Sequence, residues 1–180
     1  MIGIPLGLLY ANALEWASHK YLLHGLGRKK ESYWAFHWHE HHRNARRLGH
    51  HDPDYLRSRI GLHAQGKETL GVVVACLLHV PLFPIAPFFT GATWAYAIYS
   101  YRVHKRAHLD PEWAKRHVPW HYDHHMGPDQ HANWNTAAPW FDILMGTRQP
   151  YLGTERQRRD EERAQSRAAN PLRARVSVPT

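Results

Sequence analysis

Histidines at regular spacings are the residues of this sequence with the clearest chemistry. The chain has 17 histidines in 180 residues, and ten of them fall into four spaced groups. Residues three or four apart share one face of an α-helix, about 5–6 Å apart at Cβ, so each group can aim two or more imidazoles at one point. The ten are His19 and His24; His37, His41 and His42; His104 and His108; and His121, His124 and His125. Neutral imidazole binds zinc, copper, iron and nickel, so these groups predict a metal site.

The number of histidines indicates how many ions the site would hold. A mononuclear zinc site takes three or four ligands, so ten imidazoles suit two ions with four or five ligands each. His19 and His24 are five residues apart, roughly 140° around an ideal α-helix. This pair must therefore lie at a distorted helix end or serve different metals. A histidine-rich tract that binds metal adventitiously would show no such regular spacing.

We expect different positions and roles for the seven other histidines. Three of them can assist the site, and the sequence does not decide among them: His39, His117 and His131. Three more are expected at the surface or in turns: His50, His51 and His63. His79 stands alone in an apolar stretch, where a histidine is more often buried and hydrogen-bonded than a metal ligand.

Two apolar stretches must position these groups. Residues 1–18 contain a single charged residue and predict a short membrane-embedded helix, near the lower limit of about 17 residues for a span. Residues 70–101 contain none, and three prolines in their middle predict a bent hairpin of two helices, at about 68–80 and 86–101. Basic residues flank the hairpin but are absent from its tip, so the positive-inside rule predicts that all four histidine groups are cytoplasmic.

These observations predict an all-α fold, an integral-membrane helical domain with a cytosolic histidine-rich cap that holds a di-metal site. Residues 1–152 would form this domain. Residues 153–180 are charged without an apolar stripe, which predicts a disordered tail or a solvated helix. The net charge of +8 indicates an anionic partner, either nucleic acid or a lipid surface. The single cysteine, Cys76, excludes a disulfide framework, a Cys-based zinc finger and an iron–sulfur cluster.

Signatures of other enzyme classes are absent from the sequence. The segment His39–His42 lacks the spacing of an HExxH motif, and there is no nucleophile elbow, phosphate-binding loop or dinucleotide motif. Two metals with neutral ligands keep their full positive charge, which suits binding and activation of dioxygen. Because the chain shows no redox module, the electrons are expected from a separate protein.

The four histidine segments, HKYLLH, HWHEHH, HKRAH and HYDHH, resemble the fatty acid hydroxylase/sterol desaturase superfamily of membrane di-iron oxygenases. The resemblance covers about residues 15–147. Residues 19–25 are similar to bacterial carotenoid hydroxylases, and residues 134–147 to the fatty acid hydroxylase branch. The resemblance implies two iron ions, replaceable by zinc in purified material, held by the ten histidines. It further implies hydroxylation or desaturation of a membrane lipid or isoprenoid with O2, and electrons from a ferredoxin or a cytochrome b5-like protein.

Three other functions compete with this interpretation. A non-enzymatic metal-binding membrane protein would form no O2-dependent product. A zinc hydrolase at the membrane surface would need a carboxylate base, for which Glu40 and Asp123 are the candidates inside the clusters. A nucleic-acid binder is suggested by the charge alone, and we expect no nucleic-acid partner. We therefore expect a membrane-bound di-iron oxygenase acting on a lipid-like substrate.

Overall fold

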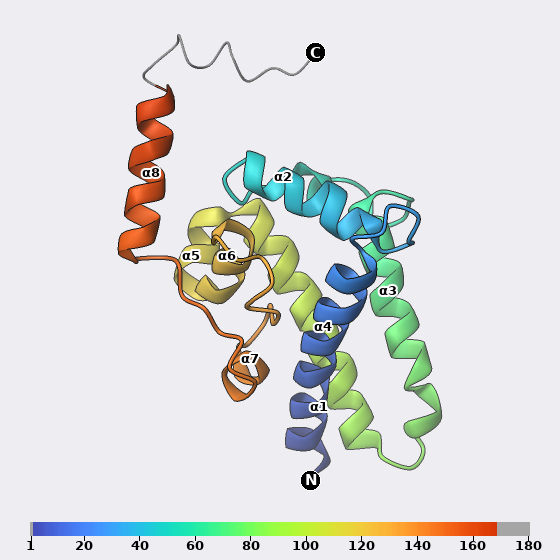
Figure 1. Cartoon of the computed structure of the whole chain (residues 1–180). Coiled ribbons are helices and arrows are strands. Elements are labelled where there is room, and N and C mark those ends of the chain that lie inside the picture. Colours follow the sequence, from blue (N-terminus) through green and yellow to red (C-terminus); the bar gives the residue numbers. More distant parts are fainter. Residues whose placement is uncertain (1, 169–180) are drawn as a thin grey trace.

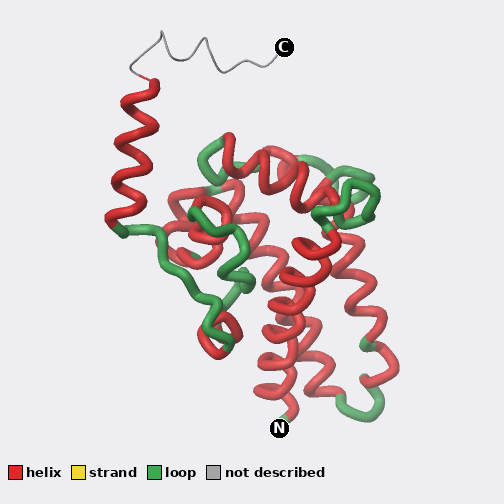
Figure 2. Tube along the Cα trace, viewed as in Figure 1, coloured by secondary structure: helices red, strands yellow, loops and turns green. Residues whose placement is uncertain are grey.

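The computed structural model describes residues 2–168, which form helices and loops without a strand (Figures 1 and 2). In chain order the helices are α1 (Gly3–Ala17), η1 (Ser18–Leu26), η2 (His37–His41), α2 (His42–Arg47), η3 (Pro53–Leu56), α3 (Ala64–Leu78), η4 (Val80–Leu82), α4 (Pro87–Leu109), α5 (Pro111–His117), α6 (Pro119–Met126), α7 (Trp140–Leu144) and α8 (Glu155–Ala168). Of these, η1 and η2 are π-helices, and η3 and η4 are 3-10 helices. The all-α part of the predicted fold is confirmed for these residues.

The stem of the molecule is the pair α1 and α4, with α3 packed beside α4 (Figure 1). Helices α1 and α4 approach closely at Gly7. A Cβ added there would lie 2.4 Å from the Phe89 carbonyl oxygen and 3.0 Å from Ala92 Cβ. Glycine permits such an approach because it has no side chain. The Thr93 hydroxyl also lies 3.4 Å from the Gly7 carbonyl oxygen, which links α4 to α1.

A polar network joins this stem to the segment that leads into α7. Asn12 Nδ2 donates hydrogen bonds to the Tyr96 hydroxyl at 2.6 Å and to the Ala138 carbonyl at 2.7 Å. The Glu15 carboxylate accepts from the Tyr96 hydroxyl at 2.9 Å and from Asn135 Nδ2 at 3.1 Å. Desolvation raises the pKa of Glu15, although these hydrogen bonds oppose the shift. The network fixes the C-terminal segment against α1, where the first histidines follow.

None of the helices among residues 2–168 has both the length and the apolar character needed to cross a membrane. The predicted integral-membrane fold and location are therefore wrong, and the assignment of the histidines to the cytoplasmic side of a membrane fails with them. Both α1 and α3 have 15 residues, roughly 22 Å at 1.5 Å per residue, against a hydrocarbon core of about 30 Å. With 23 residues α4 is longer, but its last turns carry charged side chains and two of the candidate ligands.

The predicted helical hairpin is present as α3, η4 and α4, with the prolines at its turn. Beyond residue 152, α8 stands apart from the other helices in Figure 1. Its charged side chains pair along its own surface, for example Arg156 with Asp160 at 2.9 Å and Arg159 with Glu155. The charged segment therefore includes a solvated helix instead of being disordered throughout. The part of the predicted tail at 169–180 lies outside the described residues.

A pair of glycine substitutions tests the close packing of α1 on α4. Gly7→Ala should destabilise the protein by about 1–3 kcal/mol, because the new methyl group must push the Phe89 backbone away. Gly91→Ala on α4 meets nothing within 4 Å and should stabilise the protein by about 0.5–1 kcal/mol through higher helix propensity. Urea unfolding of both variants measures the difference, and equal free energies of unfolding would contradict the packing described.

Candidate metal centre

Buried histidines gather where η1, η2, α2, α6 and the C-terminal end of α4 meet. Among residues 2–168 they form three clusters, and within each cluster the available ligand nitrogens lie within 4.8 Å of one another. The first cluster is His19, His24, His37, His42 and His124; the second is His41, His104, His108 and His125; the third is His50, His108 and His121. All ten of the histidines selected from the sequence lie in these clusters, together with His50.

The two π-helices decide which histidines enter the first cluster. In a π-helix the hydrogen bonds run from residue i to i+5, so residues five apart stand one turn from each other. His19 and His24 lie within η1 at this spacing, so of the two alternatives that the sequence left open, the structure shows the distorted helix. The same holds for His37 and His42, because the His42 N–H donates to the His37 carbonyl. His41 consequently turns to the second cluster, although α-helical spacing had paired it with His37.

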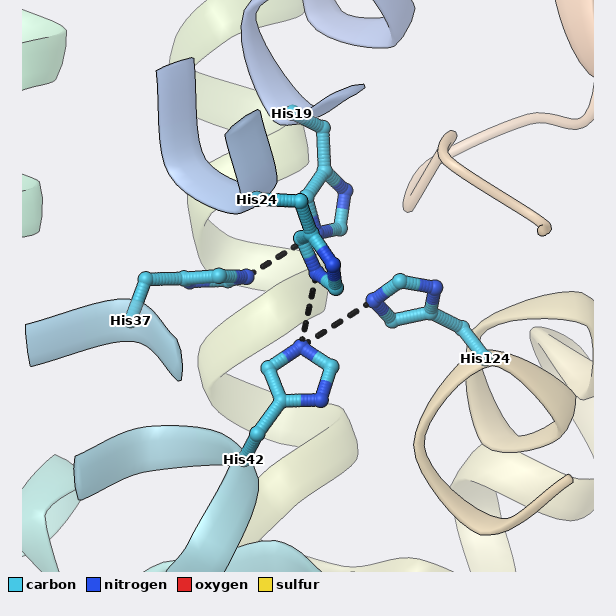
Figure 3. A group of neighbouring side chains, drawn as sticks. All are labelled: His19, His24, His37, His42 and His124. Carbon is cyan, nitrogen blue, oxygen red and sulfur yellow. Dashed lines mark hydrogen bonds between the residues drawn. The ribbon is translucent and has the colours of Figure 1, made fainter. Parts of the chain in front are cut away.

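Figure 3 shows the five imidazoles of the first cluster converging on one point from three separate segments. The Nε2 atoms of His19 and His37 are 3.0 Å apart, as are those of His24 and His42, and the Nε2 atoms of His42 and His124 are 3.2 Å apart. Nitrogens that bind one zinc ion at about 2.0–2.1 Å in a tetrahedron are roughly 3.3 Å from each other. The spacing of the rings therefore suits a shared cation.

The second ring nitrogen of several histidines is held by the protein. His19 Nδ1 donates to the Trp134 carbonyl at 2.5 Å, and His124 Nδ1 donates to the Ala132 carbonyl at 2.7 Å. A carbonyl oxygen only accepts, so the proton of each neutral ring is on Nδ1 and the lone pair is on Nε2. Metal-binding histidines are oriented in this same way by a partner on the other nitrogen.

In the second cluster two carboxylates take the place of these carbonyls. His41 Nδ1 is 2.7 Å from Asp52 Oδ2, and His104 Nδ1 is 2.6 Å from Glu68 Oε1. The Tyr55 hydroxyl donates to Glu68 at 2.5 Å and fixes that carboxylate in turn. Nδ1 partners of this kind keep a histidine in the metal-binding tautomer and make the ring more basic.

Several histidine nitrogens in the second and third clusters are buried without a hydrogen-bond partner among the described residues. They are His41 Nε2, His50 Nε2, His121 Nδ1 and both nitrogens of His125. A buried polar atom that makes no hydrogen bond costs about 1–3 kcal/mol. Unpartnered nitrogens that crowd together, with orienting partners on neighbouring rings, are the donor set of a metal site. The buried histidine clusters can therefore hold a metal ion.

Burial lowers the pKa of rings such as His19 and His37 and so keeps them in the neutral form that metals require. Desolvation is the main reason that the pKa of His19 falls to about 3 and that of His37 lies well below 6.5. Neighbouring histidines add to the shift of His37, since a charge on one ring disfavours a charge on the next. Their lone pairs are thus available for metal at neutral pH.

Three residues of the site were not recognised in the sequence. His50 lies in a turn, as expected, but its side chain is fully buried and stacks on His108 of the second cluster. Asp52 and Glu68 were not recognised as partners of histidines. Asp52 follows His50 and His51 in an apparent turn, and Glu68 precedes an apolar helix, so only the folded chain brings them to the rings.

The other histidines lie outside the three clusters. His79 is buried and hydrogen-bonded to the Ala75 carbonyl and the Tyr10 hydroxyl, as expected. The expected surface or turn positions hold for His51 and His63, which are partly exposed. The three histidines considered as assistants are not members either: His39 bonds to the Arg28 carbonyl, His117 is exposed, and His131 is exposed and stacks on Trp38.

Neither Glu40 nor Asp123, the two candidates for a hydrolytic base, offers a free carboxylate to the clusters. Glu40 is exposed on η2. Asp123 is buried, but its carboxylate pairs with Arg148 at 2.7 Å and accepts from the Leu152 N–H at 2.7 Å. Both oxygens of Asp123 therefore hold the segment that precedes α8, and a carboxylate base for a zinc hydrolase is missing at the positions the sequence offered.

Comparisons with known proteins leave the family open. No protein-family model matches the chain, and no curated protein or solved structure matches it either. The resemblance in histidine spacing to the fatty acid hydroxylase/sterol desaturase superfamily stays a prediction from the sequence.

The lowered histidine pKa values predict that the metal-free protein is destabilised by acid. In the folded protein the pKa of His19 and of His50 is about 3, whereas in the unfolded chain it is near 6.5. Between these two pH values the rings bind protons only after unfolding. Stability should therefore fall as the pH is lowered through this window, by about 1.4 kcal/mol per pH unit for each histidine. Urea unfolding of metal-free protein at pH 7.5, 6.5 and 5.5 measures this. A midpoint that is constant with pH would contradict the burial of neutral rings.

Replacing Glu68 tests the role of the carboxylate partners. Glu68→Gln should weaken binding of the ion in the second cluster by about 10–100-fold, because His104 loses its anionic partner. Binding in the first cluster should stay unchanged, since Glu68 bonds to none of its rings. Competition with a metal chelator gives both affinities. Glu40→Gln, an exposed position, is the matched control, and equal affinities in the two variants would rule out this role.

Proposed function

We propose that this chain is a di-iron oxygenase that hydroxylates or desaturates a lipid-like substrate with O2 and electrons from a separate donor protein. The observation that carries the proposal is that the first and second clusters are neighbours, are buried and consist only of imidazoles. His42 of the first cluster and His125 of the second have ring centroids 4.2 Å apart. Two ions held in these clusters would therefore be close neighbours, as a cooperating pair requires.

The ligands divide between the two ions according to the clusters. One ion would be held by His19, His24, His37, His42 and His124, and the other by His41, His104, His108 and His125. His121 lies beside the second set, with its Nε2 3.0 Å from His108 Nε2. Adjacent residues would bind opposite ions at two points, His41 with His42 and His124 with His125, so both ions would depend on the continuous η2–α2 segment and on α6.

The protein's contribution is to orient, to exclude water and to hold protons. When bound, iron would supply the activation of O2 that no side chain in this chain can perform. Asp52 and Glu68 hold the Nδ1 protons of His41 and His104, so those rings keep their lone pairs for metal. The full burial of the clusters keeps bulk water from an oxidising centre, which limits side reactions.

A shallow surface cavity borders His42 of the first cluster, whose side chain is itself buried. Its volume is about 240 Å³, and it is lined by Trp38, His39, His42, Arg43, Arg46 and Gln130. The ring centroid of Trp38 lies 5.1 Å from that of His24 and 5.4 Å from that of His42. The same ring stacks on the exposed His131. We place the contact of the electron donor, a ferredoxin or a cytochrome b5-like protein, at this cationic rim.

An apolar substrate suits the exposed surface of the stem. Large apolar side chains are exposed along α3 and the turn after it, among them Leu77, Leu78 and Ile85. Large exposed apolar patches mark binding sites for apolar partners. The main alternative, a non-enzymatic metal-binding protein, uses the same clusters but forms no product.

Metal content and product formation test the proposal together. Purified protein reconstituted with iron should hold two ions per chain and, with reduced ferredoxin and ¹⁸O2, should introduce labelled oxygen into, or desaturate, a component of a lipid extract. Zinc should fill the same sites, since imidazole does not exclude it, without supporting turnover. Two bound ions without any O2-dependent product would favour the non-enzymatic alternative, and full activity with one ion would refute the paired centre.

A matched pair of variants links the activity to the clusters. His125→Ala should abolish product formation and reduce metal content, because neighbouring groups do not replace a lost ligand. His51→Ala, at a partly exposed histidine outside the clusters, should retain both metals and turnover. If the two variants lose activity equally, the assignment of ligands is wrong.

A further inference from the structure

Trp38 joins the surface of the protein to the first cluster. It lies on η2, directly after the candidate ligand His37, and its side chain is partly exposed. The ring centroid of Trp38 is 5.1 Å from that of His24, at an interplanar angle of 73°, and 5.4 Å from that of His42, at 31°. His24 and His42 are buried members of the first cluster. One aromatic side chain thus contacts two candidate ligands and also reaches solvent.

Two exposed residues pack on the Trp38 ring. His131 stacks on it, with ring centroids 5.3 Å apart at an interplanar angle of 17°. The guanidinium carbon of Arg28 lies 5.3 Å from the Trp38 centroid, and Arg28 Nη2 donates a hydrogen bond to His131 Nε2. The ring of His131 is also centred 5.4 Å from that of His24. Aromatic rings in contact therefore lead from exposed His131 to the buried histidines, and Arg28 holds the outermost ring in place.

Exposed arginines surround this stack of rings. Arg28 and Arg43 are both exposed, and Arg43 lines the cavity beside Trp38. Arg46 lines the same cavity but is committed to the protein, since its Nη1 donates to two backbone carbonyls at 3.0 Å. Positive charge around an aromatic contact favours a negatively charged partner, because complementary charges steer the encounter and fix its orientation.

We propose that Trp38 is the residue through which electrons enter the centre, from an acidic electron-transfer protein that docks over Arg28 and Arg43. The proposal rests on the oxygenase function proposed above, and it names the route and the first acceptor. In each transfer the donor loses one electron and a ferric ion held by the first cluster becomes ferrous, while Trp38 is left unchanged as a bridge. Two such transfers, with two protons, balance the hydroxylation of one C–H bond by O2 and the release of one water molecule.

A second Arg–Trp–His group shows what such packing does without a metal cluster. On α5 the ring of Trp113 stacks on His117 with centroids 4.8 Å apart, and the guanidinium carbon of Arg106 lies 4.4 Å from the Trp113 centroid. Trp113 packs on a hydrophobic core that includes Val118, and none of the three stacked residues belongs to a histidine cluster. A structural role accounts for this kind of stack. It does not account for a ring that joins solvent to two candidate ligands, which an electron path requires.

Replacing Trp38 tests the route. Iron-loaded protein is mixed in the absence of O2 with a reduced, acidic [2Fe–2S] ferredoxin, and stopped-flow spectroscopy follows reduction of the iron. At saturating ferredoxin, Trp38→Leu should lower the rate constant by about tenfold or more, because a gap replaces packed atoms on the path. Trp38→Phe keeps a ring there and should recover part of the rate. Trp113→Leu, in the matching stack, should keep the wild-type rate, and the iron content of every variant is measured.

Docking is measured separately from electron transfer, on zinc-loaded protein that cannot be reduced. Arg28→Glu and Arg43→Glu should each weaken ferredoxin binding by about tenfold at low salt. The difference should shrink as added salt screens the charges. Arg106→Glu, in the matching stack, is the control and should bind ferredoxin as the wild type does, as should Trp38→Leu. Equal binding by all four variants would exclude docking at this surface.

The outcomes separate the route from the oxygenase function. A Trp38→Leu protein with full iron content and the wild-type rate would overturn the route, and so would equal slowing in Trp113→Leu. A wild type that accepts electrons through Trp38 but forms no product would instead refute the oxygenase function. Should Trp38→Leu lose iron, a ruthenium photoreductant attached at His131→Cys or at His117→Cys, in a Cys76→Ser background, decides. Faster light-driven reduction of the iron from position 131 would support the route, and equal rates would exclude it.

Discussion

The structure depends on the burial of neutral imidazoles whose lone pairs face one another. Eleven histidines share a small buried volume, and desolvation lowers the pKa of rings such as His37, His42 and His125 so that they do not take up protons at neutral pH. Facing lone pairs repel, and unpartnered buried nitrogens are costly. A cation between the rings resolves both problems. The centre can therefore hold a metal ion, whereas the same buried nitrogens would be unfavourable in an ordinary hydrophobic core.

The surroundings of the clusters follow from this constraint. Four of the rings have their second nitrogen held by the protein: two by the backbone carbonyls of Trp134 and Ala132 in the first cluster, and two by Asp52 and Glu68 in the second. Trp134 and Glu68 come from segments far in sequence from the rings they hold, whereas Ala132 and Asp52 lie only 8 and 11 residues from theirs. The polar network at Glu15 fixes one of those segments on α1, which ties the position of the first cluster to the α1–α4 stem.

The division of α4 into two halves shows how the apolar stretches serve the centre. Its N-terminal half packs closely on α1, where Gly7 permits backbone contact. Its C-terminal half carries His104 and His108, four residues apart on one face of a regular α-helix. The apolar residues that had indicated a membrane hairpin therefore belong to a helix that ends in charged and metal-site residues, and this composition is what prevents it from meeting the requirements of a span.

The sequence by itself determined the all-helical class and the ten regularly spaced histidines, because spacing along a helix is a local property. It did not determine how those histidines divide. A five-residue spacing indicates a shared face only in a π-helix, and the i to i+5 hydrogen bonds of η1 and η2 arise in the folded chain. Tertiary structure alone brings three further residues to the centre. His50 stacks on His108, Asp52 contacts His41, and Glu68 contacts His104. Local periodicity specifies which side chains can point together, whereas long-range packing decides which of them meet.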